Sequence, residues 1–260
     1  MRKLFVTDLD GTLVHHNKMT EGNFNALKRL KDKKCFVTVA TGRPYNGAVF
    51  LKKDYNIEID YFVLLNGALI MDGEGNVIDH KTIPYEIIKQ IVESFKKFPW
   101  EISIETGFDT FVVHGAGEIL KSVQKVTETH LEELKDKKLS LISIYGGDLD
   151  INDIEKACDD INKKYGKYVV AYRNTNFIDV VPVGCSKGEG VNHVKETLGV
   201  DKKEVYAIGD SWNDISMFKV AGKSFTFHNV EKNLKAHASY LVDSVEECVD
   251  KYIIKNKKCV

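Results

Sequence analysis

Short apolar runs alternate with helix-like segments at both ends of the chain. The runs that are typical of buried strands lie at 4–6, 35–40, 61–65, 69–71, 77–78 and 205–208. Between the first two runs, Phe24, Leu27 and Leu30 lie at helical spacing, and a helix-like stretch begins after Lys187. The runs at 69–71 and 77–78 flank a polar turn that contains glycine, which predicts a β-hairpin. Strands that alternate with helices predict a parallel sheet with right-handed crossovers.

The pattern changes after Pro84. Helices are expected at 85–98, 117–135 and 152–165. Short strands are expected at 101–105, 110–114, 139–145, 168–173 and 177–182. Because this mixture differs from the alternation on either side, we predict a separate α+β unit, residues 84–183, inserted into an α/β unit formed by 1–83 and 184–260. The lysine-rich segment 255–258 is expected to be frayed.

Two carboxylates follow the first apolar run, since Asp8 and Asp10 lie two residues apart before Gly11. Residues i and i+2 of a strand point the same way. Like charges held that close repel each other unless a cation or a shared proton relieves them. Mg²⁺ is the simplest relief, because it prefers hard oxygen ligands. The alternative is a turn with two solvated aspartates, and the pair alone leaves both possibilities open.

Further polar residues lie at element boundaries downstream. Thr41, Gly42 and Arg43 follow the second strand-like run, Lys187 opens a helix-like stretch, and an acidic segment at 209–214 follows the run at 205–208. In open α/β sheets the ligand crevice lies at the carboxyl ends of the strands. Carboxylates, a hydroxyl and an ammonium at such an edge suit a metal ion together with a phosphate group.

Composition excludes several classes of protein. The 260 residues carry a net charge of −1, so there is no basic field for a nucleic-acid partner. The five cysteines are scattered without a C-x-x-C spacing, which argues against a disulfide framework or a zinc site and for a reducing compartment. No apolar run approaches the roughly 20 residues of a membrane span, and too few apolar residues precede Asp8 for a signal peptide. We expect a cytoplasmic protein without membrane partners; its oligomeric state is unknown from sequence.

Five motifs in order carry a resemblance to a known family. They are Asp8–Leu13, Ala40–Arg43, Asn66–Ala68, Ser186–Gly188 and Gly209–Met217. With them the chain resembles the haloacid dehalogenase superfamily, and most closely its Cof-like subgroup of sugar-phosphate and cofactor-phosphate phosphatases. The resemblance implies a Rossmann-like, doubly wound parallel-sheet core whose α+β cap domain is inserted between the second and third motifs. Ser211 and the segment 228–230 depart from the subgroup pattern, which affects only the shape of the rim of the site.

The resemblance also implies a reaction, namely Mg²⁺-dependent hydrolysis of a small phosphorylated metabolite through an aspartyl-phosphate. Asp8 would be the nucleophile and Asp10 the general acid and then base. The expected catalytic residues are Asp8, Asp10, Thr41 and Lys187. Contacts to the substrate or its phosphate are expected from Leu9, Gly42, Arg43 and Asn66. Mg²⁺ is expected at Asp8, Asp10 (through its backbone carbonyl) and Asp210, with Asp214 and Asn213 holding bound waters or fixing Lys187.

Several of these residues also have structural explanations. Asp214 and Asn213 are favoured as helix N-caps, Arg43 can pair with a surface acid, and Asn66 can serve only a turn. In the cap, the sequence offers candidates for substrate specificity without ranking them. They are Glu105, Asp109, Tyr172, Arg173, Asn174 and Asp179.

Two other functions remain open at this point. A phosphomutase of the same superfamily would use the same aspartyl-phosphate without hydrolysing it. A non-catalytic phospho-switch or binding module would also place Asp, Thr and Lys around Mg²⁺. Asp10 argues against the second, because a protein that only binds has no need of that acid.

Overall fold

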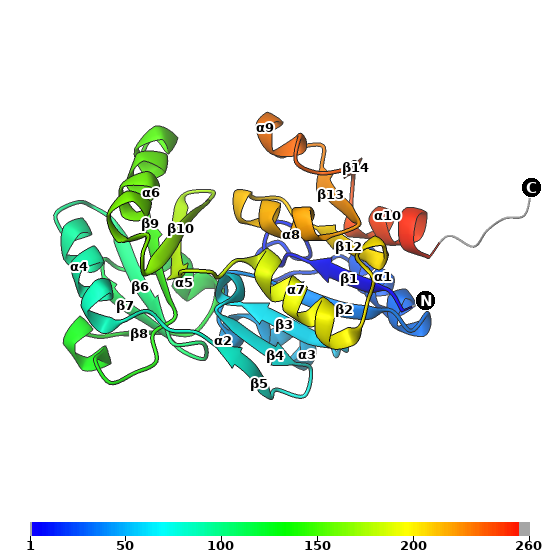
Figure 1. The fold of residues 1–260 in the computed structure, drawn as a ribbon, viewed down its shortest axis with the longest axis horizontal. Helices are drawn as coiled ribbons and strands as arrows, with labels where there is room; N and C mark the ends of the chain where they lie inside the picture. The colour runs from blue at the N-terminus through cyan, green and yellow to red at the C-terminus, as the bar shows by residue number, and fades with distance from the viewer. Residues whose placement is uncertain (1, 255–260) are drawn as a thin grey trace, which may run out of the picture.

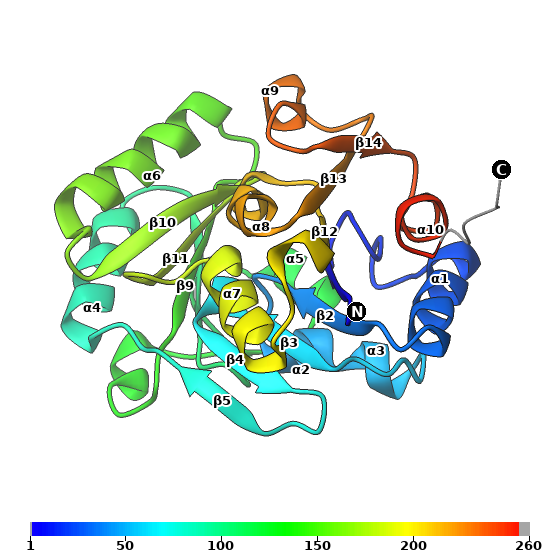
Figure 2. The same cartoon turned by 45° about the vertical axis from the view of Figure 1, so that its right-hand side comes forward.

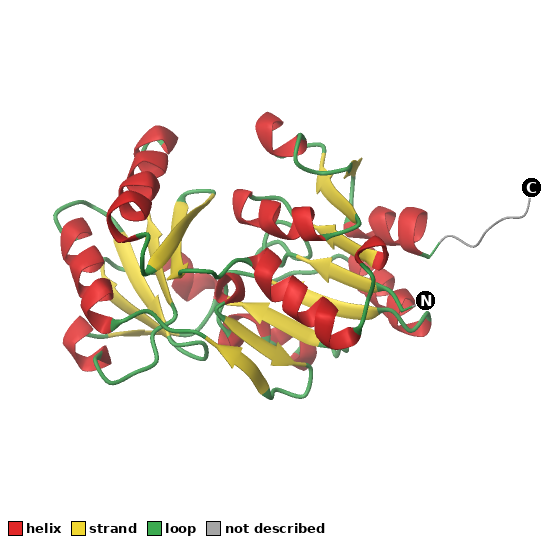
Figure 3. Cartoon of the chain, in the orientation of Figure 1, coloured by secondary structure: helices red, strands yellow, loops and turns green. Residues whose placement is uncertain are grey.

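The computed structural model describes residues 2–254, so the segment 255–258 lies outside the described residues. Two β-sheets lie side by side, each with its own helices (Figure 1). Figure 3 shows strands and helices in both parts; the two long helices of the smaller part lie on the side of its sheet away from the larger sheet. The α/β class predicted from sequence is therefore confirmed.

The larger sheet has eight strands. Their spatial order is β14 (Tyr240–Val242), β13 (Lys223–Phe227), β12 (Val205–Ile208), β1 (Leu4–Thr7), β2 (Phe36–Ala40), β3 (Tyr61–Leu64), β4 (Leu69–Asp72) and β5 (Val77–His80). The first six strands in this order pair in parallel, and β4 and β5 add the expected antiparallel hairpin at one edge. All four residues of both β1 and β12 are buried, as expected for strands covered on both faces.

Helices cover both faces of the larger sheet (Figure 2). On one face lie α1 (Glu21–Asp32) and α10 (Val245–Cys248), and on the other lie α7 (Lys187–Leu198) and α8 (Ile215–Val220). Shorter helices complete this part: α2 (Tyr45–Ala48), α3 (Phe50–Lys53) and α9 (Lys232–Lys235). This arrangement is the doubly wound, Rossmann-like core that was expected.

The smaller sheet is mainly antiparallel. Its order is β10 (Val169–Asn174), β11 (Phe177–Pro182), β9 (Leu141–Tyr145), β6 (Glu101–Glu105), β7 (Thr110–His114) and β8 (Val126–Glu128). Two amphipathic helices, α4 (Tyr85–Phe95) and α6 (Ile151–Tyr165), bury their apolar side chains against one face of this sheet. The chain leaves the larger sheet after β5 and returns at α7, so this part is an insertion in sequence. The domain boundaries at residues 83/84 and 183/184 stay a prediction.

The helix predicted at 117–135 is wrong. Only α5 (Glu118–Val123) is α-helical; the chain then extends into β8, which pairs in parallel with β7, and a 3₁₀ turn follows at Leu131–Leu134. Val126, Thr127 and Thr129 are β-branched, and such residues favour strands. Pairing with the edge of β7 therefore outweighs the helix-like pattern here.

Among the described residues, no helix combines the length and the apolar character that crossing a membrane requires.

The packing of α7 on the sheet depends on a small residue. A Cβ atom at Gly190 would lie 2.3 Å from Cγ1 of the buried Val63 on β3. We expect Gly190→Ala to lower the free energy of unfolding by roughly 1–3 kcal/mol, because overpacking outweighs the better helix propensity of alanine. Chemical denaturation measures the change. Glu196→Ala, on the exposed side of the same helix, should stay within about 0.5 kcal/mol of the wild type. An alanine variant as stable as the wild type would show that Val63 moves aside at no cost.

Candidate active site

The polar residues of the first two motifs and of the last one meet at the carboxyl edge of the parallel strands. Asp8 directly follows β1, which is flanked by β12 and β2. Thr41 directly follows β2, and Asp210 comes two residues after β12. Hydrogen-bonding of the Asp8 backbone N–H to the carbonyl of Ile208 continues the ladder, which fixes Asp8 beside the next strand end.

A tight loop brings Asp210 against the first motif. The backbone N–H groups of Leu13 and Val14 both donate to the carbonyl of Leu9, which turns the chain back. Gly11 has φ +77°, and a Cβ atom there would lie 2.5 Å from Oδ2 of Asp210, so both its conformation and its size are needed. The Thr12 hydroxyl donates to Oδ1 of Asp210 at 2.5 Å. Thr12 was not among the expected site residues, although its place within the first motif could have indicated it.

Lys187 lies at the centre of a buried ion cluster. Its Nζ is 2.6 Å from Oδ1 of Asp8 and 2.6 Å from Oδ1 of Asp214, and the side chain is only 2% exposed. Lys187 is the first residue of α7, where Ser186 is the N-cap. A cation there opposes the helix dipole. The two carboxylates offset this and raise the pKa of Lys187, although burial acts in the opposite direction. The ammonium is therefore charged at neutral pH.

Asp214 fixes both Lys187 and the acidic loop. Its Oδ1 accepts from Lys187, while its Oδ2 accepts from the backbone N–H groups of Asp210 at 2.8 Å and Ser211 at 2.9 Å. The latter bond belongs to a capping box with Ser211 at the 3₁₀ turn Trp212–Asp214. Asp214 therefore takes part in capping the 3₁₀ turn and also fixes Lys187, which are two roles that the sequence had left open.

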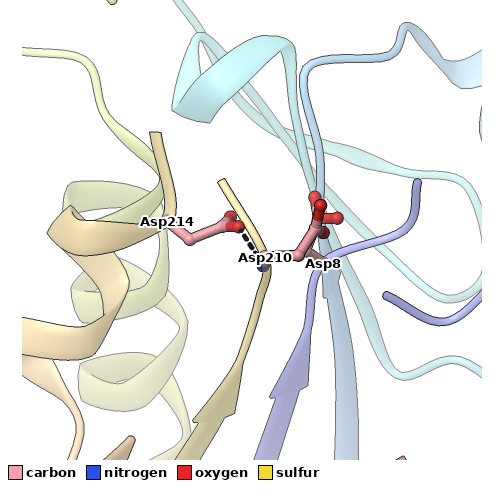
Figure 4. A group of neighbouring side chains, drawn as sticks. All are labelled: Asp8, Asp210 and Asp214. Carbon is pink, nitrogen blue, oxygen red and sulfur yellow. Dashed lines mark hydrogen bonds between the residues drawn. The ribbon is translucent and has the colours of Figure 1, made fainter. Parts of the chain in front are cut away.

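Three carboxylates lie close enough to share a cation. Oxygen atoms of Asp8, Asp210 and Asp214 all lie within 4.8 Å of one another. Figure 4 shows Asp8 and Asp210 side by side, with Asp214 reaching the backbone of Asp210. Burial raises the pKa of Asp210 to about 6, with the charge of Asp214 adding to the effect. Burial also raises the pKa of Asp8, against the opposing ammonium of Lys187. Carboxylates that repel one another at such short range, and that offer hard oxygen ligands, fit a divalent cation.

Asp10 and Arg43 form an ion pair at the rim. The Arg43 guanidinium donates from Nε to Oδ2 of Asp10 at 2.6 Å and pairs with its other oxygen through NH2. The side chain of Asp10 is 50% exposed, whereas that of Arg43 is 8% exposed. For Arg43 the structure thus shows pairing with an acid, one of the two alternatives. Thr41 is buried nearby, and its hydroxyl accepts from the backbone N–H of Arg43 at 3.1 Å.

Asn66 connects the two sheets. It has φ 49° within the 3₁₀ turn Leu65–Gly67, and its side chain is fully buried. Its Nδ2 donates to Oδ2 of Asp179 on β11 at 2.8 Å, and its Oδ1 accepts from Asn213 at 3.2 Å. The side-chain amide of Asn213 thus uses its nitrogen for this bond. Its oxygen, Oδ1, is buried without a hydrogen-bond partner among the described residues.

A cavity of about 380 Å³ lies between the strand ends and the smaller sheet. Seven expected site residues line it: Asp8, Asp10, Thr41, Gly42, Arg43, Asp210 and Asn213. Three expected site residues do not line the cavity but hold residues that do. Lys187 holds Asp8, Asp214 holds the backbone of Asp210, and Asn66 holds Asp179. Leu9 is buried in the core, so only its backbone can serve the site.

A family model described as haloacid dehalogenase-like hydrolase matches residues 5–253. The chain belongs to the haloacid dehalogenase-like hydrolases.

Relatives and a solved structure agree with this family over nearly the full length of the hydrolase. 5-Amino-6-(5-phospho-D-ribitylamino)uracil phosphatase YwtE of Bacillus subtilis is 26% identical over 273 residues, which cover 94% of each chain. HMP-PP phosphatase of Klebsiella pneumoniae is 26% identical over 249 residues, covering 93% of this chain and 89% of its own. A haloacid dehalogenase-like hydrolase from B. subtilis of known structure matches with a TM-score of 0.86 at 20% identity, covering 97% of this chain and 100% of its own.

These matches confirm the Cof-like assignment and the fold. The protein is an enzyme of the phosphoric monoester hydrolase class.

The smaller sheet of this hydrolase contributes three of the six cap candidates to the cavity wall. They are Glu105, Asn174 and Asp179. Asp109 is exposed, and the Tyr172 hydroxyl donates to the carbonyl of Cys185 at 2.8 Å.

Arg173, the remaining cap candidate, links the two parts of the chain. Its guanidinium pairs with Glu231 at 2.9 Å and lies 5.2 Å from the centre of the Trp212 ring, within the acidic loop. The Trp212 indole N–H donates to the same carboxylate at 3.0 Å. Arg173 itself is buried, whereas the side chain of Glu231 is 49% exposed, so one side of this contact faces solvent.

Glu105 is a buried acid without a cationic partner among the described residues. Burial raises its pKa to about 8, although hydrogen bonds from Thr110 and Ser103 oppose the shift and the charges of Asp179 and Asp109 add to it. The ordinary value is 4.5. The folded state therefore retains this proton over a pH range in which the unfolded state has lost it.

This difference predicts a pH dependence of stability. A raised folded pKa gives stability that is fully present below about 4.5 and is lost as the pH rises towards about 8. Glu105→Gln is uncharged in both states, so its stability relative to the wild type should increase between pH 5 and pH 8 by on the order of 2–4 kcal/mol. Urea denaturation across this range measures it. Glu93→Gln, at an exposed position of α4, should track the wild type. Parallel curves for Glu105→Gln and the wild type would contradict the burial of an acid here.

Proposed function

We propose that this hydrolase is a Mg²⁺-dependent phosphatase that hydrolyses a small phosphorylated metabolite, a sugar phosphate or a cofactor phosphate, through an aspartyl-phosphate. The observation that carries the proposal is Asp8, a carboxylate 5% exposed that lines the cavity, with one oxygen held by Lys187. An oriented, charge-balanced carboxylate at the floor of a cavity suits a nucleophile. The relatives named above, both phosphatases, support the same reaction.

The reaction proceeds in two displacement steps. A carboxylate oxygen of Asp8 forms a bond to phosphorus as the ester P–O bond breaks, and the leaving oxygen takes a proton from Asp10. Asp10 then takes a proton from water, whose oxygen attacks phosphorus. The P–O bond to Asp8 breaks, which releases inorganic phosphate and restores the carboxylate.

Asp10 must change partner to play this part. Its carboxylate lies against Arg43 at the rim, half exposed. We propose that it turns from the guanidinium to the leaving oxygen when substrate binds, which frees Arg43 to contact a substrate oxygen. The position of Asp10 supports this, since its side chain lines the same cavity as Asp8.

The remaining residues neutralise and orient the phosphoryl group. Lys187 supplies a positive charge beside Asp8, and the Thr41 hydroxyl and the backbone N–H groups of Leu9 and Gly42 supply hydrogen-bond donors. Asn66 does not line the cavity, so it acts on the substrate indirectly, by holding the wall at Asp179.

Mg²⁺ would be held by Asp8, by the backbone carbonyl of Asp10 and by Asp210. Asp214 and Asn213 would support its water ligands. When bound, the ion withdraws negative charge from the phosphoryl oxygens. Asp214 already accepts three hydrogen bonds, so it serves the site mainly through Lys187 and the loop. The proposal also includes a cap domain at 84–183 and a cytoplasmic location without nucleic-acid or membrane partners.

The nucleophile and the acid can be separated by substitution. Asp8→Asn should lower kcat by at least about 10³-fold with an unchanged fold, because an amide cannot form the acyl phosphate. Asp10→Asn should accumulate the phosphoenzyme with p-nitrophenyl phosphate, whose leaving group needs no acid, because water then lacks a base. Intact-protein mass spectrometry after an acid quench detects the added phosphoryl group.

Asp32→Asn, an exposed change at the end of α1, is the matched control and should behave as the wild type. Near-wild-type turnover by Asp8→Asn would contradict the assignment of Asp8 as the nucleophile.

The metal can be tested by binding as well as by rate. Removal of divalent ions with EDTA should abolish turnover, and excess Mg²⁺ should restore it. Mg²⁺ should also raise the thermal midpoint of the wild type, because it relieves repulsion between Asp8 and Asp210 in the folded state only. Asp210→Asn should lose most of this shift. Unchanged turnover in EDTA, together with no thermal shift, would contradict the metal assignment.

A further inference from the structure

The loop that carries Asp210 and Asp214 is connected to the smaller sheet through all three residues that lie between them. The connections go to one hairpin, β10–β11, which reaches the loop just before α8 (Figure 2). Two of the loop residues donate hydrogen bonds, and the third presents an aromatic ring. In chain order, Ser211, Trp212 and Asn213 are connected to Asn174, to Arg173 and, through Asn66, to Asp179. The hairpin therefore bears on the segment that fixes two carboxylates of the site.

The Ser211 hydroxyl is bonded on two sides. Its oxygen accepts from the backbone N–H of Asp214, as part of the capping box, and its hydrogen is donated to Oδ1 of Asn174 at 3.1 Å. The Asn174 amide is oriented by its other bond, because its Nδ2 faces a carboxylate oxygen of Asp179 at 3.3 Å and must donate to it. Ser211 is buried, so water competes little for these bonds. One hydroxyl thus joins the turn that orders the loop to a strand of the other sheet.

The hydrogen bonds continue in a closed ring that returns to the loop. Oδ2 of Asp179 accepts from Asn174 at 3.3 Å and from Asn66 at 2.8 Å. Asn66 in turn accepts from Asn213 at 3.2 Å. Ser211 and Asn213, two residues apart, are therefore tied to the same carboxylate by separate routes. Four members of this ring are buried, all except Asn174. A buried network whose members bond one another holds its shape, whereas the loss of one member leaves buried groups unpaired.

The conformation of the loop matters because it places the charges of the site. One oxygen of Asp214 accepts from the backbone N–H groups of Asp210 and Ser211, and its other oxygen holds Lys187. Lys187 in turn lies 2.6 Å from Asp8. A displacement of about 1 Å in such a group can lower a rate about 100-fold. The bond between Ser211 and the hairpin can therefore act on Asp8 and Asp210 without any contact to the substrate.

Both partners of this bond also line the cavity, which allows a different role, direct contact with the substrate. The Ser211 hydroxyl, however, has given its only hydrogen to Asn174. Both polar atoms of Asn174 already take part in the ring, Oδ1 with Ser211 and Nδ2 with Asp179. A role through the loop is therefore favoured, and measurements on the metal-free protein separate the two roles.

We propose that Ser211 and Asn174 are positioning residues: their hydrogen bond sets the loop conformation in which Asp210 and Asp214 hold their places. The phosphoryl-transfer site is then fully assembled only while the hairpin β10–β11 is seated against the loop. The proposal rests on the phosphatase function and adds to it two residues that act through others.

Hydrogen exchange of the metal-free protein tests the connection itself. Asn174→Ala keeps the capping box but removes the acceptor for Ser211. Backbone exchange in a peptide covering 209–214 should therefore accelerate at least about threefold, although the substituted residue lies 37 positions away in the chain. Asn176→Ala is the matched control, because the same side chain in the same hairpin bonds the carbonyl of Gly147 within the smaller part of the chain. It should leave exchange at 209–214 unchanged. Equal exchange in the wild type and in Asn174→Ala would overturn the inference, whatever the activity.

Mg²⁺ binding, measured by calorimetry without substrate, tests the consequence for the carboxylates. Ser211→Ala and Asn174→Ala should each weaken Mg²⁺ binding about three- to tenfold, the range expected for one lost hydrogen bond. Ser211→Thr, which keeps a hydroxyl, should stay within about twofold of the wild type. On the Ser211→Ala background, Asn174→Ala should change the affinity less than about twofold, because both substitutions act through one bond. Effects that multiply would show that the two residues act separately and would contradict the assignment.

Kinetics with p-nitrophenyl phosphate and a hexose monophosphate distinguish positioning from substrate contact. At saturating Mg²⁺, Asn174→Ala should lower kcat at least about threefold for both compounds, with KM within about twofold of the wild type. A raised KM for the hexose monophosphate alone, with unchanged kcat and Mg²⁺ affinity, would make Asn174 a substrate contact and refute the inference. Absence of turnover in the wild type would refute the phosphatase function, and exchange at 209–214 would still decide whether the hairpin holds the loop.

Discussion

A single buried ammonium holds this active site together. Lys187 lies 2.6 Å from carboxylate oxygens of both Asp8 and Asp214, so the end of β1, the start of α7 and the loop after β12 meet at one charge. Burying any of the three ions alone would cost several kcal/mol. Each therefore keeps its place only because the others are present. The closely packed helix that carries Lys187 and the tight loop around Gly11 both serve to bring these charges into contact.

Four aspartates at one sheet edge are differentiated by their partners. Asp214 is saturated by Lys187 and two backbone N–H groups. Asp8 shares Lys187 yet lines the cavity. Asp210 is held by the Thr12 hydroxyl, and Asp10, at the rim, is held by Arg43. Four chemically identical carboxyl groups thus differ in burial, partners and exposure because of their surroundings alone, and the different roles proposed for them rest on these differences.

Local patterns in the sequence were sufficient for most of the fold. The strand ends that carry Asp8, Thr41 and Asp210 were visible as apolar runs followed by glycine-containing turns, and parallel pairing then brought them together. The helix expected at 117–135 failed because β8 depends on the neighbouring edge of β7, a contact that no local pattern contains. The same limit applies to side-chain pairs. Asp10 with Arg43, and Asn66 with Asp179, join residues 33 and 113 positions apart. The cap residues could be named from sequence but not ranked, because Glu105, Asn174 and Asp179 come to line one cavity only once strands far apart in the sequence are paired.

The contact of Arg173 with Trp212 and Glu231 has a thermodynamic consequence. Trp212 lies between Asp210 and Asp214 in the chain, so a cap strand touches the same short loop that carries the carboxylates. Two binding events that both depend on the conformation of one loop are linked, and linkage is reciprocal. If seating the cap favours the loop conformation that binds a cation, then the cation must favour the seated cap by the same factor. Binding of a cation at the sheet edge and enclosure of the substrate by the cap would then be coupled parts of one equilibrium.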